Sequence, residues 1–95
     1  MIVEYHPLTA SDLNRAVSYY KRQRPGEELR AEVYETIALI RSNPLQFVIV
    51  ERAIRRAFVH RFPYSVLFRV VNDETVRVLV IRHHRRRPGF GLSRR

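Results

Sequence analysis

The chain has 95 residues, 45% of them hydrophobic, and its 18 Lys and Arg against 9 Asp and Glu give a net charge of +9. This length supports one hydrophobic core, the hydrophobic content is too high for a disordered chain, and the absence of cysteine excludes disulfides and a thiol nucleophile. Because no apolar run approaches the roughly 20 residues that cross a bilayer and no basic segment of a signal peptide begins the chain, we expect one soluble cytoplasmic domain.

The first segment predicts a strand followed by a helix. Ile2 to Tyr5 is short and rich in strand-forming residues, and His6-Pro7 ends it. Thr9 and Asp12 have the spacing of a capping box, in which each side chain bonds a free backbone N–H of the first helical turn. Apolar residues then follow at helical spacing to about Arg22: Leu13, Ala16, Val17 and Tyr20.

A second helix is predicted after Pro25-Gly26. Glu27 and Glu28 fall at its start, where the helix dipole favours negative charge, and Asn43-Pro44 ends it. Its apolar residues repeat every three or four positions: Leu29, Val33, Ile37 and Ile40. Because the link is short, the two helices should form an antiparallel hairpin, and their apolar faces require a sheet to cover.

The second half of the sequence supplies that sheet. Leu45 to Val50 is predicted to be a connecting loop with some strand character. Three strands should follow in a meander: Ile54 to Phe62, Ser65 to Val71 and Val76 to His83. Pro63 ends the first of them, because proline cannot donate to the ladder, and Asn72-Asp73-Glu74 forms the turn between the other two.

The pattern of side chains within these strands predicts how the sheet is arranged. In the middle strand, Val66, Phe68 and Val70 should face one side, and Ser65, Leu67 and Arg69 the other. In the last strand, Val76, Val78 and Val80 alternate with Arg77, Leu79 and Ile81. Both faces of the last strand are therefore largely apolar, and we expect it to be central. The element order β-α-α-β-β-β favours an α+β fold. In this fold a two-helix hairpin packs on a mostly antiparallel four-stranded sheet.

From about Arg85 onward the chain should form a basic tail. No acidic residue follows Glu74, whereas seven arginines do: Arg77, Arg82, Arg85, Arg86, Arg87, Arg94 and Arg95. Positions 82 to 87 hold four arginines and two histidines, which would repel one another if unpaired. A solvated tail is one interpretation. The alternative is an anionic partner, either an acidic protein segment or a phosphate backbone, which would relieve the repulsion.

Several sequence segments, spread over nearly the whole chain, form a distinctive pattern together with its length, charge and element order. They are Leu13 to Tyr20, Ile37-x-x-Ile40 before Asn43-Pro44, Arg56-x-Phe58-x-x-x-Phe62-Pro63-Tyr64-x-Val66-x-Phe68-Arg69-Val70, Val78 to Ile81, and His83-x-Arg85-Arg86-x-Pro88. Together they resemble the RelE/ParE family of toxins from type II toxin–antitoxin systems, especially its ParE-like branch. The resemblance implies one toxin domain over residues 1–95, a RelE/ParE-like fold, and a cognate antitoxin protein bound in a hetero-oligomer.

The resemblance indicates the family but leaves two kinds of target open. ParE-like members poison DNA gyrase and have no known chemistry of their own, whereas RelE-like members are ribosome-dependent endonucleases that cut messenger RNA without a metal. Those ribonucleases carry an arginine after the position of Tyr64 and a tyrosine after a C-terminal arginine. Here Ser65 occupies the first position, and no tyrosine follows Arg86. The resemblance therefore favours gyrase over the ribosome.

Three alternatives remain beside the gyrase inhibitor. A ribonuclease would use Arg56, His60, Arg61 and Arg86. A plain nucleic-acid-binding module would need aromatic residues beside basic ones, and Phe90 is the only aromatic in the tail. A degenerate toxin would retain only its antitoxin partner. We expect no cofactor and no metal, because His83 and His84 are adjacent in a strand and must point to opposite faces.

The exposed sheet face and the tail are predicted to form the working surface. Arg56 and Arg69 belong to a solvated face or pair with the acidic second helix, unless one of them receives an antitoxin carboxylate. The antitoxin would add an acidic and apolar segment, as a strand or a helix. The residues expected to bind antitoxin or target are Arg56, Arg69, Arg82, His83, Arg85, Arg86, Arg87 and Phe90.

Overall fold

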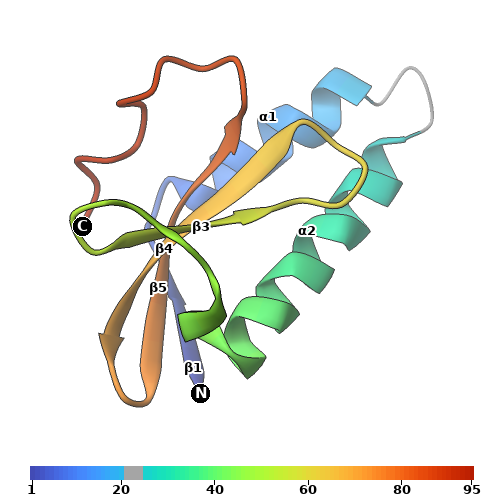
Figure 1. Ribbon diagram of the computed structural model, residues 1–95. Helices are drawn as coiled ribbons and strands as arrows, with labels where there is room; N and C mark the ends of the chain where they lie inside the picture. The colour runs from blue at the N-terminus through green and yellow to red at the C-terminus, as the bar shows by residue number, and fades with distance from the viewer. Residues whose placement is uncertain (21–24) are drawn as a thin grey trace.

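Two helices cover one face of a five-stranded sheet in the computed structural model, which describes residues 1–20 and 25–95 (Figure 1). The elements are β1 (Ile2–Tyr5), α1 (Thr9–Tyr20), α2 (Gly26–Ser42), a 3-10 turn η2 (Pro44–Gln46), β2 (Ile49–Glu51), β3 (Ile54–Phe58), β4 (Tyr64–Asn72) and β5 (Thr75–His83). The strand order is β1-β5-β4-β3-β2, with β1 parallel to β5 and the other pairs antiparallel. The α+β class is confirmed, and β5 is an interior strand as expected, although β4 and not β5 is the middle strand of the five.

Both helices form where the apolar spacing predicts them. The predicted end of α1 at about Arg22 lies outside the described residues. The capping box at its start is wrong, because both side chains bond elsewhere. The Thr9 hydroxyl donates to the Val78 carbonyl across 3.4 Å, and the Asp12 carboxylate accepts hydrogen bonds from Arg94 and from the Ile81 backbone N–H. Contacts with β5 and the tail have therefore replaced a local cap.

The prediction of four strands misses β2. This strand lies within and just beyond the segment expected to be a loop, and it forms a hairpin with β3 through Arg52-Ala53. Arg52 adopts a positive φ of 51°. Glycine or asparagine usually occupies such a position in a two-residue hairpin turn, so the sequence carries no turn signal here. Burial gives no signal either, because all three residues of β2 are exposed.

The strand expected over Ile54 to Phe62 is shorter than predicted and ends at Phe58. The following residues turn toward β4, and Arg61 takes a positive φ of 69° within this turn. The turn brings the Arg61 guanidinium to α2, where it contacts Glu32 at 3.2 Å and Glu28 at 3.5 Å. An ion pair with the acidic helix thus exists, but Arg61 makes it rather than Arg56 or Arg69.

The main core lies between the helices and the sheet. The apolar stripes of α1 and α2 pack against β4 and β5; the buried residues include Leu13, Ala16, Val17, Leu29, Val33, Ile37, Ile40, Val66, Phe68, Val76 and Val78. In β5 the predicted alternation fails beyond Val78. Because Leu67 pairs with Val80 but Phe68 pairs with Val78, Leu79 is an extra residue in the strand. This bulge sends Val80 to the outer face and Ile81 to the helix face.

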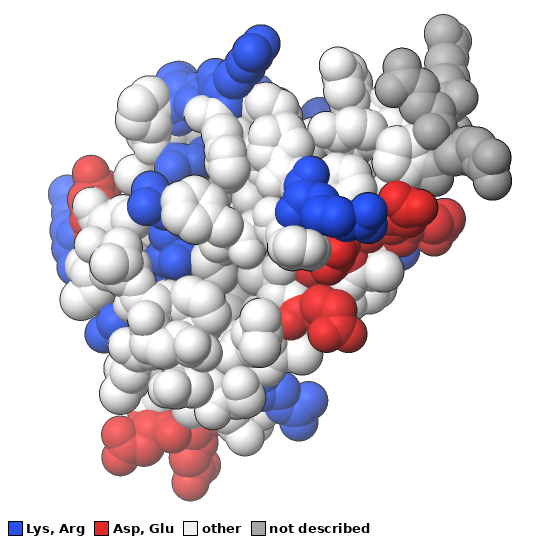
Figure 2. Space-filling view, turned by 45° about the vertical axis from the view of Figure 1, so that its right-hand side comes forward, with Lys and Arg blue, Asp and Glu red and all other residues white. Residues whose placement is uncertain are grey.

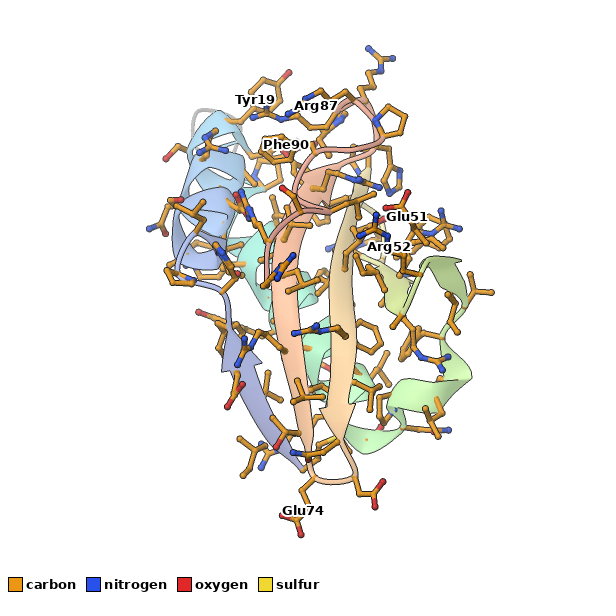
Figure 3. All side chains as sticks on the ribbon, turned by 90° about the vertical axis from the view of Figure 1, so that its left-hand side faces the viewer. Tyr19, Glu51, Arg52, Glu74, Arg87 and Phe90 are labelled. Atoms are coloured by element: carbon orange, nitrogen blue, oxygen red, sulfur yellow. The ribbon has the colours of Figure 1, made fainter. Side chains whose placement is uncertain are left out.

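The outer face of the sheet is not fully exposed, contrary to expectation. A second apolar cluster forms there from Ile54, Leu67, Leu79 and Val80, and the tail residues Phe90 and Leu92 pack against it. Figure 3 views this face, with the tail lying against β5. The tail is therefore folded onto the sheet, because it covers apolar side chains that would otherwise meet water.

Candidate functional site

Arginines surround the apolar centre of the outer face. The strand register places Arg56 in one row with Leu67 and Val80, and Arg69 in the neighbouring row between Ile54 and Arg77. Arg77 is neutralised by Glu4, with its Nη2 atom 2.7 Å from the carboxylate oxygen. The Nε atoms of Arg56 and Arg69 are buried and have no hydrogen-bond partner among the described residues. Two buried donors at this face therefore have no acceptor from within the described residues.

Arg82 lies on the same face, in the row that also contains Phe58 and Ser65. Its Nη1 atom donates to the carbonyls of Pro88 at 2.6 Å and Phe90 at 3.2 Å, which holds the tail in place. Burial, followed by repulsion from Arg56, lowers the pKa of the Arg82 guanidinium below its usual value. Arg56 on β3 and Arg82 on β5 thus place two like charges on the same face, on either side of β4.

Phe58 is an exposed aromatic residue beside these arginines. The residue is 61% exposed, although it is a large apolar residue at the end of β3. The Arg56 guanidinium stacks over one face of the ring at 4.5 Å, and the His84 imidazole meets it edge-on at 5.5 Å. The His84 Nε2 atom is also 3.0 Å from the Ser65 hydroxyl. An exposed aromatic ring is therefore held in a fixed orientation within a basic environment.

A cleft lies between α1 and the tail at one end of the molecule. Its lining residues include Tyr19, Tyr64, His83, Arg86 and Phe90. Figure 3 shows that Tyr19, Arg87 and Phe90 come together at this end. Arg86 stacks on the Phe90 ring at 4.4 Å, and His83 packs against Tyr64 at 5.0 Å. Arg85, Arg86 and Arg87 are all exposed. The three tail arginines are therefore available to a partner.

The two adjacent histidines point to opposite faces, as the strand pattern predicts. His83 faces the cleft beside Tyr64, whereas His84 contacts Phe58 and Ser65 on the outer face. Burial, followed by the charges of His84, Arg85 and Arg86, lowers the pKa of His83 below its usual value. The imidazole of His83 is therefore favoured in its neutral form, so it adds little positive charge to the cleft.

The four residues considered for a ribonuclease lie in three different environments. Arg56 is on the outer face, Arg86 is stacked on Phe90, and Arg61 is turned toward α2, where Glu28 and Glu32 neutralise it. His60 is exposed in the turn beside Arg61. RNA cleavage without a metal requires such groups to converge on one phosphate. The interactions found here hold Arg61, Arg86 and Arg56 to separate partners.

Opposite charges occupy different parts of the surface. In Figure 2 most basic groups lie in the upper half of the view, whereas acidic groups form separate patches mainly at the right and the bottom.

Within residues 1–20 and 25–95, no three His, Asp or Glu residues lie close enough together to hold a metal ion. None of the helices in the same ranges is both long and apolar enough to cross a membrane.

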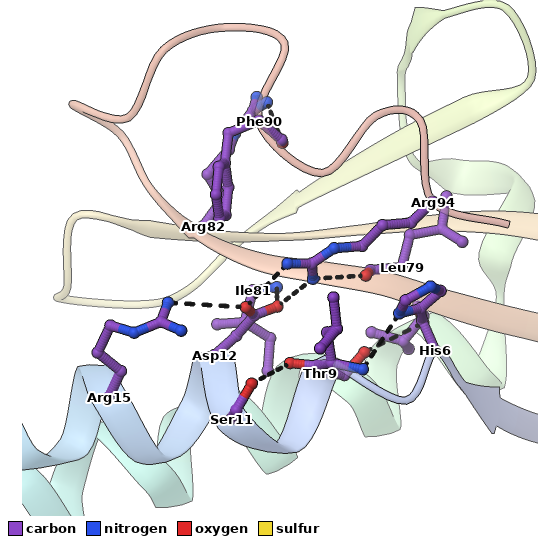
Figure 4. A network of polar contacts seen from close by, with 12 residues as sticks. His6, Thr9, Ser11, Asp12, Arg15, Leu79, Ile81, Arg82, Phe90 and Arg94 are labelled. Carbon is purple, nitrogen blue, oxygen red and sulfur yellow. Dashed lines mark hydrogen bonds and ion pairs between the residues drawn. The ribbon is translucent and has the colours of Figure 1, made fainter.

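Three features of this region were not predicted from the sequence. The exposure of Phe58 could have been suspected, because Arg56-x-Phe58 puts both side chains on the same face of a strand. The contact between Ser65 and His84 joins residues 19 positions apart and depends on the strand register. The ion pair between Asp12 and Arg94 (Figure 4) joins the first helix to the end of the tail, and no local pattern indicates it.

Comparison with known proteins gives a consistent result. The family model described as the ParE toxin of type II toxin–antitoxin systems matches residues 3–88. Among solved structures, a chain from the chromosomal ParDE toxin–antitoxin system of P. aeruginosa superposes with a TM-score of 0.71 and 21% identity, covering 87% of this chain and 95% of that chain. At this identity the likeness shows a shared fold. No curated protein has a significantly similar sequence.

Proposed function

Since the chain belongs to the ParE toxin family of type II toxin–antitoxin systems, we propose that it is an active toxin that arrests growth and that a cognate antitoxin neutralises it. The observation that carries this proposal is the family match, which spans residues 3–88 and thus includes both helices and, except for Ile2 of β1, all five strands that the structure describes. The toxin acts by binding DNA gyrase and trapping it on cleaved DNA, the mode of action of ParE-like proteins.

The arrangement of the basic residues supports a binding role over RNA cleavage. Arg61 is neutralised by α2, and Ser65 stands where ribonuclease relatives carry an arginine. Arg86 stacks on Phe90, and no tyrosine follows it in the chain. A gyrase inhibitor needs surface complementarity to its target rather than convergent proton-transfer groups, so these features are compatible with it.

The antitoxin binds through the basic tail and the outer sheet face. Its acidic side chains pair with the exposed arginines at positions 85 to 87. They also pair with Arg56 and Arg69, whose Nε atoms lack partners within the described residues. Its apolar side chains cover Phe90, which is only half-buried. The proposed contact residues are Arg56, Arg69, Arg82, His83, Arg85, Arg86, Arg87 and Phe90.

Induction of the chain in bacterial cells tests the target directly. The gene is induced with and without its neighbouring antitoxin gene, and growth, DNA breaks and messenger RNA cleavage are followed together. Growth arrest with DNA breaks and intact messages, relieved by the antitoxin, is the expected result. Message cleavage at ribosomes would overturn the gyrase proposal. Induction without any arrest would contradict an active toxin.

A further inference from the structure

The outer sheet face combines an exposed aromatic ring with positive charges that no carboxylate neutralises. We refer to Arg56, Phe58, Arg69, Arg82 and His84 as the Phe58 surface. Neither Arg56 nor Arg69 forms an ion pair within the described residues, and Arg82 donates only to backbone carbonyls. This differs from Arg61 and Arg77, which have carboxylate partners on α2 and β1. The positive charge of this surface is therefore free to attract an anion.

The position of Phe58 suggests the kind of anion. Phe58 is 61% exposed although Arg56 stacks over its ring, so stacking of a planar partner on the exposed part would remove apolar surface from water. His84 contacts the ring edge-on and is fixed by the Ser65 hydroxyl, so the orientation of the ring is supported from the side. Aromatic rings beside arginines bind unpaired nucleic-acid bases by stacking, while the arginines hold the phosphates.

We infer that the Phe58 surface binds single-stranded nucleic acid, with one base stacked on Phe58 and neighbouring phosphates held by Arg56, Arg69 and Arg82. This property goes beyond toxin neutralisation and does not require gyrase. Side chains on the same face of neighbouring rows are about 7 Å apart along a strand, since each residue rises by about 3.3 Å. The three arginines therefore lie in successive rows, at a spacing that suits neighbouring phosphates of one strand.

An acidic protein segment is the main competitor for the same arginines. It would pair with the guanidinium groups equally well, and its apolar side chains would cover Phe58, but such a contact requires apolar volume rather than a flat aromatic ring. The two occupants therefore differ in their dependence on Phe58. Different probes also represent them. An oligonucleotide with bases represents nucleic acid, whereas a base-free phosphodiester chain or a polyglutamate peptide of the same charge represents negative charge alone.

The test measures fluorescence anisotropy of labelled 12-nucleotide thymidine and uridine strands with the full-length toxin. We expect binding of at least one strand, and about tenfold weaker binding by the Phe58→Ala variant, the size typical for loss of one stacked base. The matched control is Leu45→Ala, which removes a similarly exposed apolar side chain outside the surface. Phe58→Leu should behave like Phe58→Ala, because it keeps the apolar volume but loses the ring.

Salt dependence tests the arginines separately. For single strands, each phosphate contact contributes about 0.7 to the slope of log affinity against log salt. The Arg56→Gln variant should lower this slope by about that amount, whereas Arg30→Gln on α2, which removes the same charge, should not. Thermal melting checks that each variant is folded, and the comparison of Phe58→Leu with Leu45→Ala does not depend on the stability of the arginine variants.

Three results would overturn the inference. The first is that neither strand binds, and the second is that Phe58→Ala and Leu45→Ala bind equally well. The third is that a base-free phosphodiester chain or a polyglutamate peptide binds as tightly as the strands with bases. In the last case the surface recognises negative charge alone, and an acidic protein segment is its occupant. Because these measurements contain no gyrase and no antitoxin, their failure leaves the proposed toxin function to be judged by its own experiment.

Discussion

Arg94 donates to the Asp12 carboxylate across 2.6 Å and so joins the end of the chain to the first helix. A second guanidinium nitrogen reaches the other carboxylate oxygen at 3.2 Å, and the same guanidinium donates to the Leu79 carbonyl (Figure 4). Both side chains are largely buried, with 1% of Asp12 and 12% of Arg94 exposed. The family match ends at Pro88, so this ion pair lies partly beyond it.

Substitution of Arg94 by glutamine should destabilise the protein by about 3 kcal/mol. Removal of one partner of a buried ion pair leaves the other charge buried and unpaired, which typically costs several kcal/mol. Urea unfolding of Arg94→Gln, Asp12→Asn and the double variant gives the coupling between the two groups. Arg95→Gln, at the exposed neighbouring position, is the control. Strictly additive effects in the double variant would show that the pair contributes no coupling.

Gly91 should not tolerate alanine, whereas Gly89 should. Gly91 has a φ of +81°, and a Cβ atom placed on it would lie 2.7 Å from the Val80 Cβ atom in β5. The same atom on Gly89 would meet only the Arg87 side chain, at 4.0 Å. We expect Gly91→Ala to lower the free energy of unfolding by about 1–3 kcal/mol, from backbone strain and displacement of the tail. Equal melting temperatures of the two variants would contradict the docked tail.

Stability should fall as the pH drops below the ordinary histidine range, and His83 should contribute to this fall. Burial and the nearby positive groups lower the pKa of His83 in the folded protein. The unfolded chain therefore binds more protons between the folded pKa and about 6.5, so the free energy of unfolding rises with pH across that window. Urea unfolding at several pH values should show a weaker dependence for His83→Gln than for His60→Gln, whose side chain is exposed. An identical dependence in both variants would contradict the role of His83.

His60 and Arg61 should be dispensable for toxicity. Arg61 pairs with Glu28 and Glu32 through contacts that are more than half exposed on the arginine side, so Arg61→Gln should cost less than about 1 kcal/mol of stability. Induction of His60→Gln and Arg61→Gln in cells that lack the antitoxin should still arrest growth, with normal protein levels as the control. Loss of arrest in a stable variant would favour RNA cleavage over gyrase binding.

Both helices and four of the five strands were predictable from the sequence because they depend on local patterns, whereas β2 carries no such pattern. The repeat of Leu29, Val33 and Ile37 fixes one face of α2, and the apolar residues on both faces of β5 indicate an interior strand of the sheet. The family resemblance rests on the same residues, since Tyr64 to Val70 is both a motif and a strand. These features require no knowledge of which segments meet in space.

Tertiary structure alone decided how the arginines are distributed among partners. Arg61, Arg77 and Arg94 find carboxylates on other elements, whereas Arg56 and Arg69 form no ion pair within residues 1–20 and 25–95, and no local pattern indicates this difference. Ion pairing depends on a separation of a few ångströms, which the strand register, the bulge at Leu79 and the turn at Arg61 set together. The cover formed by the tail has the same origin, because hydrophobic contact depends on proximity in space, not in sequence.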